Sequence, residues 1–343
     1  MRSFANLPAV RKGLREEGES VFNPEVSSAM LPNKIPVLRE RSKLRSKIEG
    51  WAGVAGTKRG FGFPTGSRQG APEKLACRVM RVVDLDRDMS DVIPTGLTPD
   101  SEFLFDRMTR VTLDRAQPGP GTWVLDVASG VGQDSIALAA RGAHVVGAEP
   151  SGRMTGMAQM FAADKPGPMP EWVRGWSDKL PFSPESFDAC ICKGAMDHFD
   201  TPERAIAEMA RVTKPEGRVV LAIANFESLA CRVGRALDDF RQDVLGLSPL
   251  RERRGYDAPS DHFTRYEPDL IREQAEKSLI IESVEGISMG WGMPGWSKWM
   301  ARVPRPVADV AVRFMDQLAR HWPGLSDVIV LVGRPRRSAS TSA

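Results

Sequence analysis

The stretch that decides the fold is Val124-Leu125-Asp126-Val127-Ala128-Ser129-Gly130-Val131-Gly132-Gln133-Asp134. Its pattern is that of a β-strand that breaks into a turn of small residues and then opens a helix. Small residues let the backbone approach a ligand closely, and the first N–H groups of a helix have no partner within the helix. The stretch therefore predicts a ligand-binding turn between a strand and a helix.

A carboxylate follows at the end of the next predicted strand. Glu149 ends the β-like run 143–148, where a carboxylate can accept hydrogen bonds from both hydroxyl groups of a ribose. The glycine turn alone is weak evidence for a ligand site, because tight turns and close helix packing use glycine too. The turn and Glu149 together predict a nucleoside pocket at the C-terminal edge of a sheet.

The rest of the central chain alternates between strand and helix patterns. Such alternation predicts an α/β fold with a doubly wound, Rossmann-like, mostly parallel sheet that carries helices on both faces. The segment Lys214-Pro215-Glu216-Gly217 is expected to separate the fourth helix from the fifth strand. Strands are expected at 122–127, 143–148, 171–174, 187–192 and 218–224, and helices at 101–116, 134–140, 151–163 and from 201 onward.

The last hundred residues carry a mixed pattern. Helices are expected at 226–244, 268–277 and 306–321, and strands at 279–288 and 328–332. The run 289–300 is rich in Trp and Met, and adaptable Met with rigid Trp suits an apolar ligand or a membrane surface as well as ordinary packing.

The positive charge is concentrated near the N-terminus. Residues 1–80 hold 15 Lys and Arg against 7 Asp and Glu, whereas residues 81–343 hold 32 against 37. Residues 1–75 are therefore expected to form a basic extension without a packed core, with one short helix at 37–48. Neither a spanning apolar run nor a leader pattern stands out, so a cytoplasmic protein is expected.

The four cysteines predict no metal site. Cys190 and Cys192 lie on one face of a predicted strand, and no second Cys/His pair at metal spacing accompanies them. Buried free thiols are expected.

Five blocks of sequence carry a family resemblance. With these blocks the chain resembles the class I S-adenosylmethionine-dependent methyltransferases over about residues 101–285, in particular the ubiquinone/menaquinone-biosynthesis methyltransferase-like (type 11) group. The blocks are Leu125-Asp126-x-Ala128-x-Gly130-x-Gly132, Gly147-Ala148-Glu149-Pro150-Ser151, Leu180-Pro181-Phe182-x-x-x-Ser186-Phe187-Asp188, the run from His198 through Glu208-Met209-x-Arg211-Val212-x-Lys214-Pro215-x-Gly217, and His262-Phe263-x-Arg265-Tyr266.

The resemblance implies a seven-stranded sheet with an antiparallel last strand and a site for S-adenosyl-L-methionine. It implies a helical cap at 76–120 and a methyltransferase domain at 121–343, with substrate-lid elements in about 226–325. The implied cofactor residues are Asp126, Ala128, Ser129, Gly130, Gly132, Glu149, Pro150, Ser151, Trp176, Ser177 and Lys193.

Among these residues, the stretch from Ala128 to Gly132 would line the methionine end, and Glu149 would hold the ribose. Two positions depart from the family pattern, which has Gly at position 128 and often Asp at position 176. Trp176 would hold adenine by stacking, together with the Ser177 backbone. For Lys193, an ion pair with Asp197 and a contact with substrate remain alternatives.

The resemblance implies methyl transfer to a small, largely apolar metabolite, with O-methylation favoured over C- or N-methylation. Ser135 stands where a dinucleotide fingerprint has its third Gly, which argues against an NAD enzyme. The run 193–198 lacks the Pro-Pro-aromatic motif of base-amine methylases. A nucleic-acid methyltransferase that uses the basic arm and a cofactor-binding scaffold without catalysis stay open, and so does peripheral membrane contact.

Two histidines are candidate catalytic residues. His198 follows the predicted strand 187–192, and His262 lies before the helix expected at 268–277. An imidazole can accept a proton at neutral pH, so each is a candidate for orienting or removing the acceptor proton.

Overall fold

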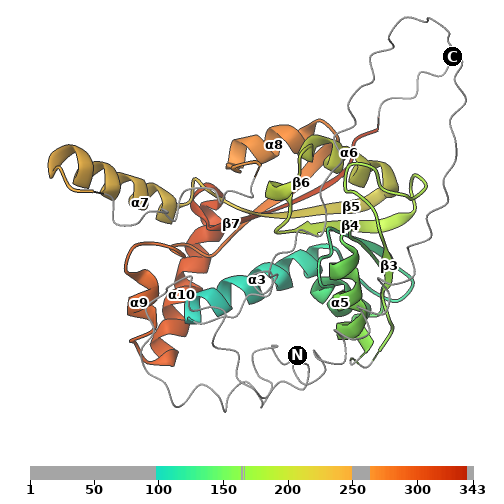
Figure 1. Cartoon of the computed structure of the whole chain (residues 1–343), viewed down its shortest axis with the longest axis horizontal. Coiled ribbons are helices and arrows are strands. Elements are labelled where there is room, and N and C mark those ends of the chain that lie inside the picture. Colours follow the sequence, from blue (N-terminus) through green and yellow to red (C-terminus); the bar gives the residue numbers. More distant parts are fainter. Residues whose placement is uncertain (1–97, 164, 166, 249–262, 338–343) are drawn as a thin grey trace, which may run out of the picture. The chain divides into compact units, whose positions relative to one another are not determined.

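The computed structural model describes residues 98–163, 165, 167–248 and 263–337 (Figure 1). The chain divides into two compact units, Met1–Met80 and Arg81–Ala343, and all the described residues belong to the second unit. The expected basic extension, its short helix at 37–48, Cys77 and His262 lie outside the described residues.

Seven strands form one sheet in the order β3-β2-β1-β4-β5-β7-β6. Strands β1 to β5 run parallel to one another, and β7 runs antiparallel to both β5 and β6. The expectation of a mostly parallel, seven-stranded sheet with an antiparallel last strand is confirmed. The strands are β1 (Trp123–Val127), β2 (His144–Ala148), β3 (Glu171–Val173), β4 (Phe187–Lys193), β5 (Thr213–Ala224), β6 (Leu279–Ile287) and β7 (Val328–Pro335).

Helices cover both faces of this sheet. Figure 1 shows α6 and α8 above the sheet and α3, α5 and α10 below it. Within the part of the chain that the structure describes, no helix has the length and apolar character needed to span a bilayer. The helices are α3 (Pro99–Arg115), α4 (Gln133–Ala139), α5 (Gly152–Ala163), α6 (Pro202–Val212), α7 (Leu229–Asp239), α8 (Pro268–Glu276), α9 (Trp296–Met300) and α10 (Arg305–His321), with short helical turns η5 (Met196–His198), η6 (Phe240–Val244) and η7 (Pro323–Leu325).

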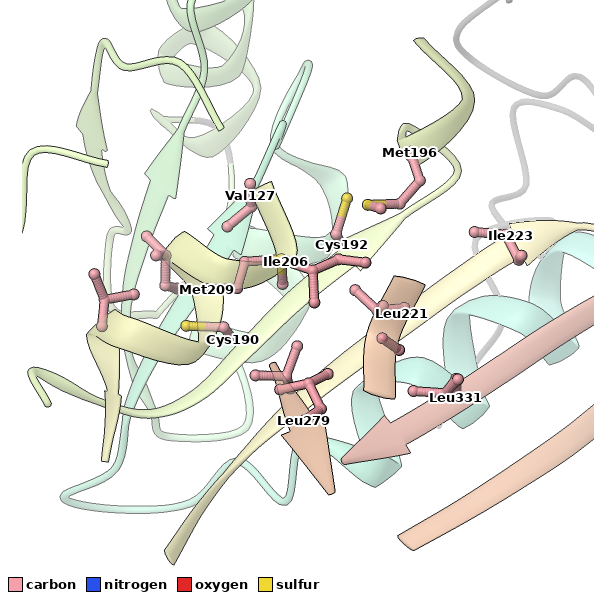
Figure 2. Packing of buried hydrophobic residues seen from close by; sticks show 14 of the residues in the cluster. Val127, Cys190, Cys192, Met196, Ile206, Met209, Leu221, Ile223, Leu279 and Leu331 are labelled. Atoms are coloured by element: carbon pink, nitrogen blue, oxygen red, sulfur yellow. The ribbon is translucent and has the colours of Figure 1, made fainter. Parts of the chain in front are cut away.

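The core lies in two layers because alternate strand residues face opposite sides of the sheet. Cys190 and Cys192 of β4 pack with Ile206 and Met209 of α6 on one side (Figure 2), whereas Ile191 belongs to the layer under α3. Both thiols are free and fully buried, and burial raises the pKa of Cys190 to about 12. The expectation of buried free thiols is confirmed for these two residues.

The segment Lys214–Gly217 is not the expected break but the first part of β5. Thr213 already pairs with Phe187, and the register then shifts before Ala189 pairs with Arg218. Proline and glycine mark such an irregularity in a strand as readily as they mark a turn. Sequence alone does not distinguish the two cases.

The helix expected at 226–244 begins three residues later. The Asn225 side chain accepts a hydrogen bond from the Glu227 N–H, which makes a tight turn after β5, and Ser228 then caps the helix by accepting from the Cys231 N–H. The final turn continues as the π-helical η6. The other boundaries agree within three residues, and the Trp/Met-rich run 289–300 contains the short helix α9.

Candidate cofactor site at the carboxyl edge of the sheet

The turn after β1 has the backbone conformation that its small residues suggest. Ala128, Gly130 and Gly132 have φ angles of 57°, 53° and 76°, all in the left-handed region that favours glycine. The N–H groups of Ala128 and Ser129 both donate to the carbonyl oxygen of Ala148, at 2.8 and 3.3 Å. The turn is therefore fixed to the end of β2.

Glu149 joins this turn to the start of α5. Its side chain is buried, and one carboxylate oxygen accepts from the Gly130 N–H at 3.0 Å while the other accepts from the Ser151 N–H at 3.0 Å. Each carboxylate oxygen can accept more than one hydrogen bond, so the group can bind hydroxyl donors in addition to these amides. The carboxylate is thus held in a fixed orientation at the edge where the parallel strands end.

Trp172 of β3 supports the turn from below, and the sequence did not point to it. A Cβ atom added to Gly147 would lie 2.6 Å from the Trp172 ring, and one added to Gly132 would also collide with that ring. The ring therefore packs against bare backbone at two places. The available signal was Gly147 itself, because a glycine inside a strand often marks close approach by a neighbour.

A buried polar network lies behind the turn. Ser135 of α4 donates to the Asp126 carboxylate at 2.6 Å. Lys193, at the end of β4, donates to Asp134 at 2.8 Å and to Thr109 of α3 at 2.7 Å. The ion-pair partner of Lys193 is therefore Asp134 and not Asp197. This network fixes α3 to the turn and to β4.

Burial changes the protonation of Asp126. The side chain is 3% exposed, and burial, together with the nearby charge of Asp134, raises its pKa to about 7. The structure places Asp126 beneath the turn, hydrogen-bonded to the first turn of α4, so its direct partner is the protein itself.

The remaining residues that are expected to bind the cofactor lie at the same edge. The carbonyl oxygen of Pro150 accepts from the Arg174 guanidinium, and the Ser151 hydroxyl accepts from the Met154 N–H at the start of α5. Trp176 forms an isolated β-bridge with Lys179, and Trp176 and Ser177 are both half-buried. These residues follow β2 and β3 directly.

His198 is exposed on η5, the short turn that follows β4. The carbonyl oxygen of the preceding Asp197 accepts from the N–H groups of Phe263 and Thr264, so the loop before α8 lies against this turn. The second candidate base, His262, lies outside the described residues. The structure thus places one of the two histidines at the edge where β4 ends.

The segment between β6 and β7 also leaves and returns at this edge. Ile287 pairs with Val328, and Val328 pairs with Ala224 at the end of β5. The Asp327 carboxylate accepts from the N–H groups of Gly290 and Trp291 at 3.1 and 2.9 Å, and burial raises its pKa to about 7. Residues 288–327 are therefore anchored beside the carboxyl ends of the parallel strands.

Two adjoining cavities of about 510 and 570 Å³ lie elsewhere. They share residues of α8 and η7, and their linings include none of the predicted site residues. Among the described residues, no group of three or more His, Cys, Asp or Glu side chains is arranged to hold a metal ion.

The residues at the turn fit a ligand that combines an amino acid with a nucleoside. Glu149 provides a fixed acceptor for hydroxyl groups, and the left-handed turn lets a bound ligand approach the backbone closely. The buried hydroxyl of Ser129 has no hydrogen-bond partner among the described residues, which leaves a polar atom for a bound molecule to satisfy. The donors and acceptors present therefore suit S-adenosylmethionine.

Comparison with known proteins agrees with this chemistry. A protein-family model described as a methyltransferase domain matches residues 125–221, the region from β1 to β5. The chain contains an S-adenosylmethionine-dependent methyltransferase domain. The chain resembles a demethylmenaquinone methyltransferase of Clavibacter sepedonicus, with 38% identity over 34% of this chain and 47% of that protein. It thus spans about half the length of that relative.

Other relatives are matched over more of their length. A demethylmenaquinone methyltransferase of Corynebacterium kroppenstedtii is 28% identical over 65% of this chain and 90% of that protein. The solved structure of the YcgJ protein from Bacillus subtilis aligns with 18% identity and a TM-score of 0.45, over 68% of this chain and all of that one.

Proposed function

We propose that this methyltransferase transfers the methyl group of S-adenosyl-L-methionine to a small, largely apolar acceptor. The cofactor part of this proposal rests on the position of Glu149. Its carboxylate bridges the left-handed turn and the start of α5 by accepting hydrogen bonds from two backbone N–H groups. A carboxylate fixed at the end of the second strand is suited to the two hydroxyls of a ribose.

The cofactor supplies a methyl group on a sulfonium, which is already a good leaving group. The protein therefore mainly needs to align the acceptor with that methyl group and to exclude competing water. In this proposal the residues from Ala128 to Gly132 bind the methionine end, and Trp176 and Ser177 flank adenine. The network of Asp126, Asp134 and Lys193 acts as the support that keeps the turn in place.

The acceptor is inferred from the relatives and from the aromatic residues at the sheet edge. Trp291 lies edge-on to Phe105 of α3, with ring centroids 6.1 Å apart, and its indole N–H donates to Ser101. The relatives named as demethylmenaquinone methyltransferases point to a quinone-type acceptor. Such an acceptor can receive the methyl group on a ring carbon, and this similarity favours carbon over the hydroxyl oxygen that the sequence favoured.

The competing proposals have less support. A nucleic-acid methyltransferase would depend on the basic arm, which lies outside the described residues, and no described feature favours it. A scaffold without catalysis would have the same Glu149 geometry as an enzyme. Only a measurement of turnover therefore distinguishes the scaffold from the proposed methyltransferase.

Calorimetry with S-adenosylmethionine and its demethylated product tests the cofactor half. Glu149→Gln is expected to weaken binding roughly ten- to a hundredfold, because loss of hydrogen bonds to a charged acceptor costs about 1.5–3 kcal/mol. The matched control is Glu216→Gln, whose side chain is 87% exposed, and it should bind as the wild type does. Absence of binding by the wild type would refute the proposal.

Incubation with isotope-labelled cofactor tests the acceptor half. Reduced naphthoquinones, simple phenols and short oligonucleotides would be offered in parallel, and NMR of the product would identify the methylated atom. Transfer to the naphthoquinols alone supports the proposal. Transfer to the oligonucleotides, or cofactor binding without transfer to any acceptor, contradicts it.

A further inference from the structure

Helix α10 has two apolar faces, of which the fold uses only one. Ala308, Val312 and Ala319 are buried on the face that packs against α3 and β6, and the Arg107 guanidinium of α3 donates to Asp316 on the same face. On the opposite side, Val307, Val310 and Phe314 are 50%, 69% and 61% exposed. Residues spaced by three and four lie in one line along a helix. The second face is therefore a continuous apolar stripe open to solvent.

A tryptophan extends the stripe onto the neighbouring helix α9. Trp299 is 44% exposed, while Met300 beside it is buried in a small cluster with Ala308 and Val312. Figure 1 shows α9 and α10 next to each other, beside the start of α3. We define the α9–α10 surface as Trp299, Val307, Val310 and Phe314.

Positive side chains flank this surface. The run from Trp291 to His321 holds five basic and two acidic residues. Both acids are neutralised, because Asp309 pairs with Arg305, and Asp316 pairs with Arg107 and Arg320. The remaining cations are Lys298, Arg302 and Arg313, which are exposed and form no ion pair with any described residue.

The surface belongs to the segment that leaves the sheet beside the cofactor site. Residues 288–327 connect β6 to β7 at the edge where β1, β2 and β4 end. A lipid-soluble molecule drawn from a layer that contacts α9 and α10 would therefore enter at the edge of the sheet that also holds Glu149, and not at the far end of the strands.

We propose that the α9–α10 surface docks on the face of an anionic lipid bilayer, with the apolar stripe in the boundary between headgroups and acyl chains. An exposed apolar face with tryptophan and flanking unpaired cations is the pattern of a helix that lies in that boundary. Each cation near an anionic surface strengthens such binding. The inference rests on the proposed lipophilic acceptor, because docking supplies that acceptor to the site.

Flotation of the full-length protein with vesicles tests the docking. The wild type is expected to float with vesicles of phosphatidylcholine and phosphatidylglycerol and far less with phosphatidylcholine alone. Val310→Glu combined with Phe314→Glu should weaken partitioning by at least about tenfold, because two apolar side chains that enter the bilayer are replaced by charges that the anionic surface repels. The matched control is Met160→Glu on α5, also an exposed apolar residue on a helix, which should float like the wild type.

A second variant tests the charges without altering the apolar stripe. Lys298→Gln with Arg302→Gln and Arg313→Gln should lower partitioning into anionic vesicles by about tenfold or more, and added salt should reduce the difference. Because all three residues are exposed, these substitutions leave the fold intact, and cofactor binding in the same preparation checks this.

Three results would overturn the proposal. One is a wild type that floats with neither kind of vesicle, and another is full binding by both variants. The third is a dimer by light scattering that Val310→Glu with Phe314→Glu converts to monomers, since a second copy would then cover the surface. Vesicle binding can be measured without turnover. If the protein does not bind vesicles but still transfers methyl groups, the docking proposal is wrong and the proposed function stands. If it binds vesicles but does not transfer methyl groups, the proposed function is wrong and the docking result stands.

Discussion

Asp126 makes the stability of the protein depend on pH. Its folded-state pKa of about 7 lies above the usual 3.8 because the carboxyl group is buried and lies near Asp134. A group with a raised folded-state pKa stabilises the fold most below its unfolded pKa, and this contribution is lost as the pH rises toward 7. Burial also raises the pKa of Asp327, so this residue makes the stability fall with rising pH in the same way.

Asp126→Asn is expected to make this pH dependence smaller. The amide keeps an acceptor for the Ser135 hydroxyl and has no charge to bury. Between pH 5 and pH 8 the wild type should lose on the order of 2 kcal/mol more of its free energy of unfolding than the variant does. Urea denaturation at the two pH values measures this difference. Equal losses in both proteins would show that Asp126 does not titrate in this range.

Substitution of His198 tests whether a positioned base contributes to methyl transfer. A general base normally contributes on the order of 10² or more to the rate, so His198→Ala should reduce kcat by about that factor if His198 removes the acceptor proton. His144→Gln is the control, because His144 stacks on Trp123 at the opposite edge of the sheet. Turnover of His198→Ala within about threefold of the wild type would mean that alignment alone drives the reaction.

The sequence predicted the residues that a local pattern defines and missed those that only packing defines. The turn and Glu149 were found because a strand, a small-residue turn and a carboxylate follow one another in the chain. Trp172 and Thr109 were missed, because each meets the site through a distant partner, at Gly147 and at Lys193. The functional roles assigned to His198, Trp176 and Ser177 stay predictions.

At the level of elements, β2, β3 and the turn after β1 are held in register by one aromatic ring. Gly147→Ala should lower the free energy of unfolding by about 1–3 kcal/mol, because the new methyl group would lie 2.6 Å from the Trp172 ring. Gly156→Ala on α5 is the matched control. It has open space around its Cβ position and should stabilise the protein by about 0.5–1 kcal/mol.

Thermal and urea denaturation compare these two alanine variants. Cofactor affinity should fall for Gly147→Ala alone, since displacement of Trp172 also moves Gly132 and the turn. If both variants show the same stability, the ring has room to move and does not set the position of the turn.

Element boundaries show where local patterns fail. The start of β5 was predicted as a helix stop because Pro215 and Gly217 resemble a turn, yet pairing with β4 extends the strand through them. The start of α7 was placed too early because the hydrogen bonds of Asn225 override the apolar periodicity of the residues that follow. In both cases a contact with the neighbouring strand or turn decided the outcome, and periodicity could not show it.

At the scale of the whole molecule, β7 holds the outer half of the sheet together. Leu331 of β7 is buried between Leu221 of β5 and Val284 of β6 in register. Leu331→Ala is expected to cost about 2–5 kcal/mol of the free energy of unfolding. Ile280→Ala, at an exposed position of β6, should cost less than about 1 kcal/mol. Chemical denaturation separates the two, and similar costs would mean that β7 contributes little to the cohesion of the sheet.

The position of β7 also determines when the sheet can be completed during synthesis. A chain emerges from the ribosome N-terminus first, so β5 and β6 appear before the strand that separates them in the native order. Until residues 328–335 have emerged, β5 keeps an unpaired edge, and such an edge is a template for pairing with another chain. The nascent protein is therefore most exposed to aggregation, and most dependent on chaperones, while the segment between β6 and β7 is being made.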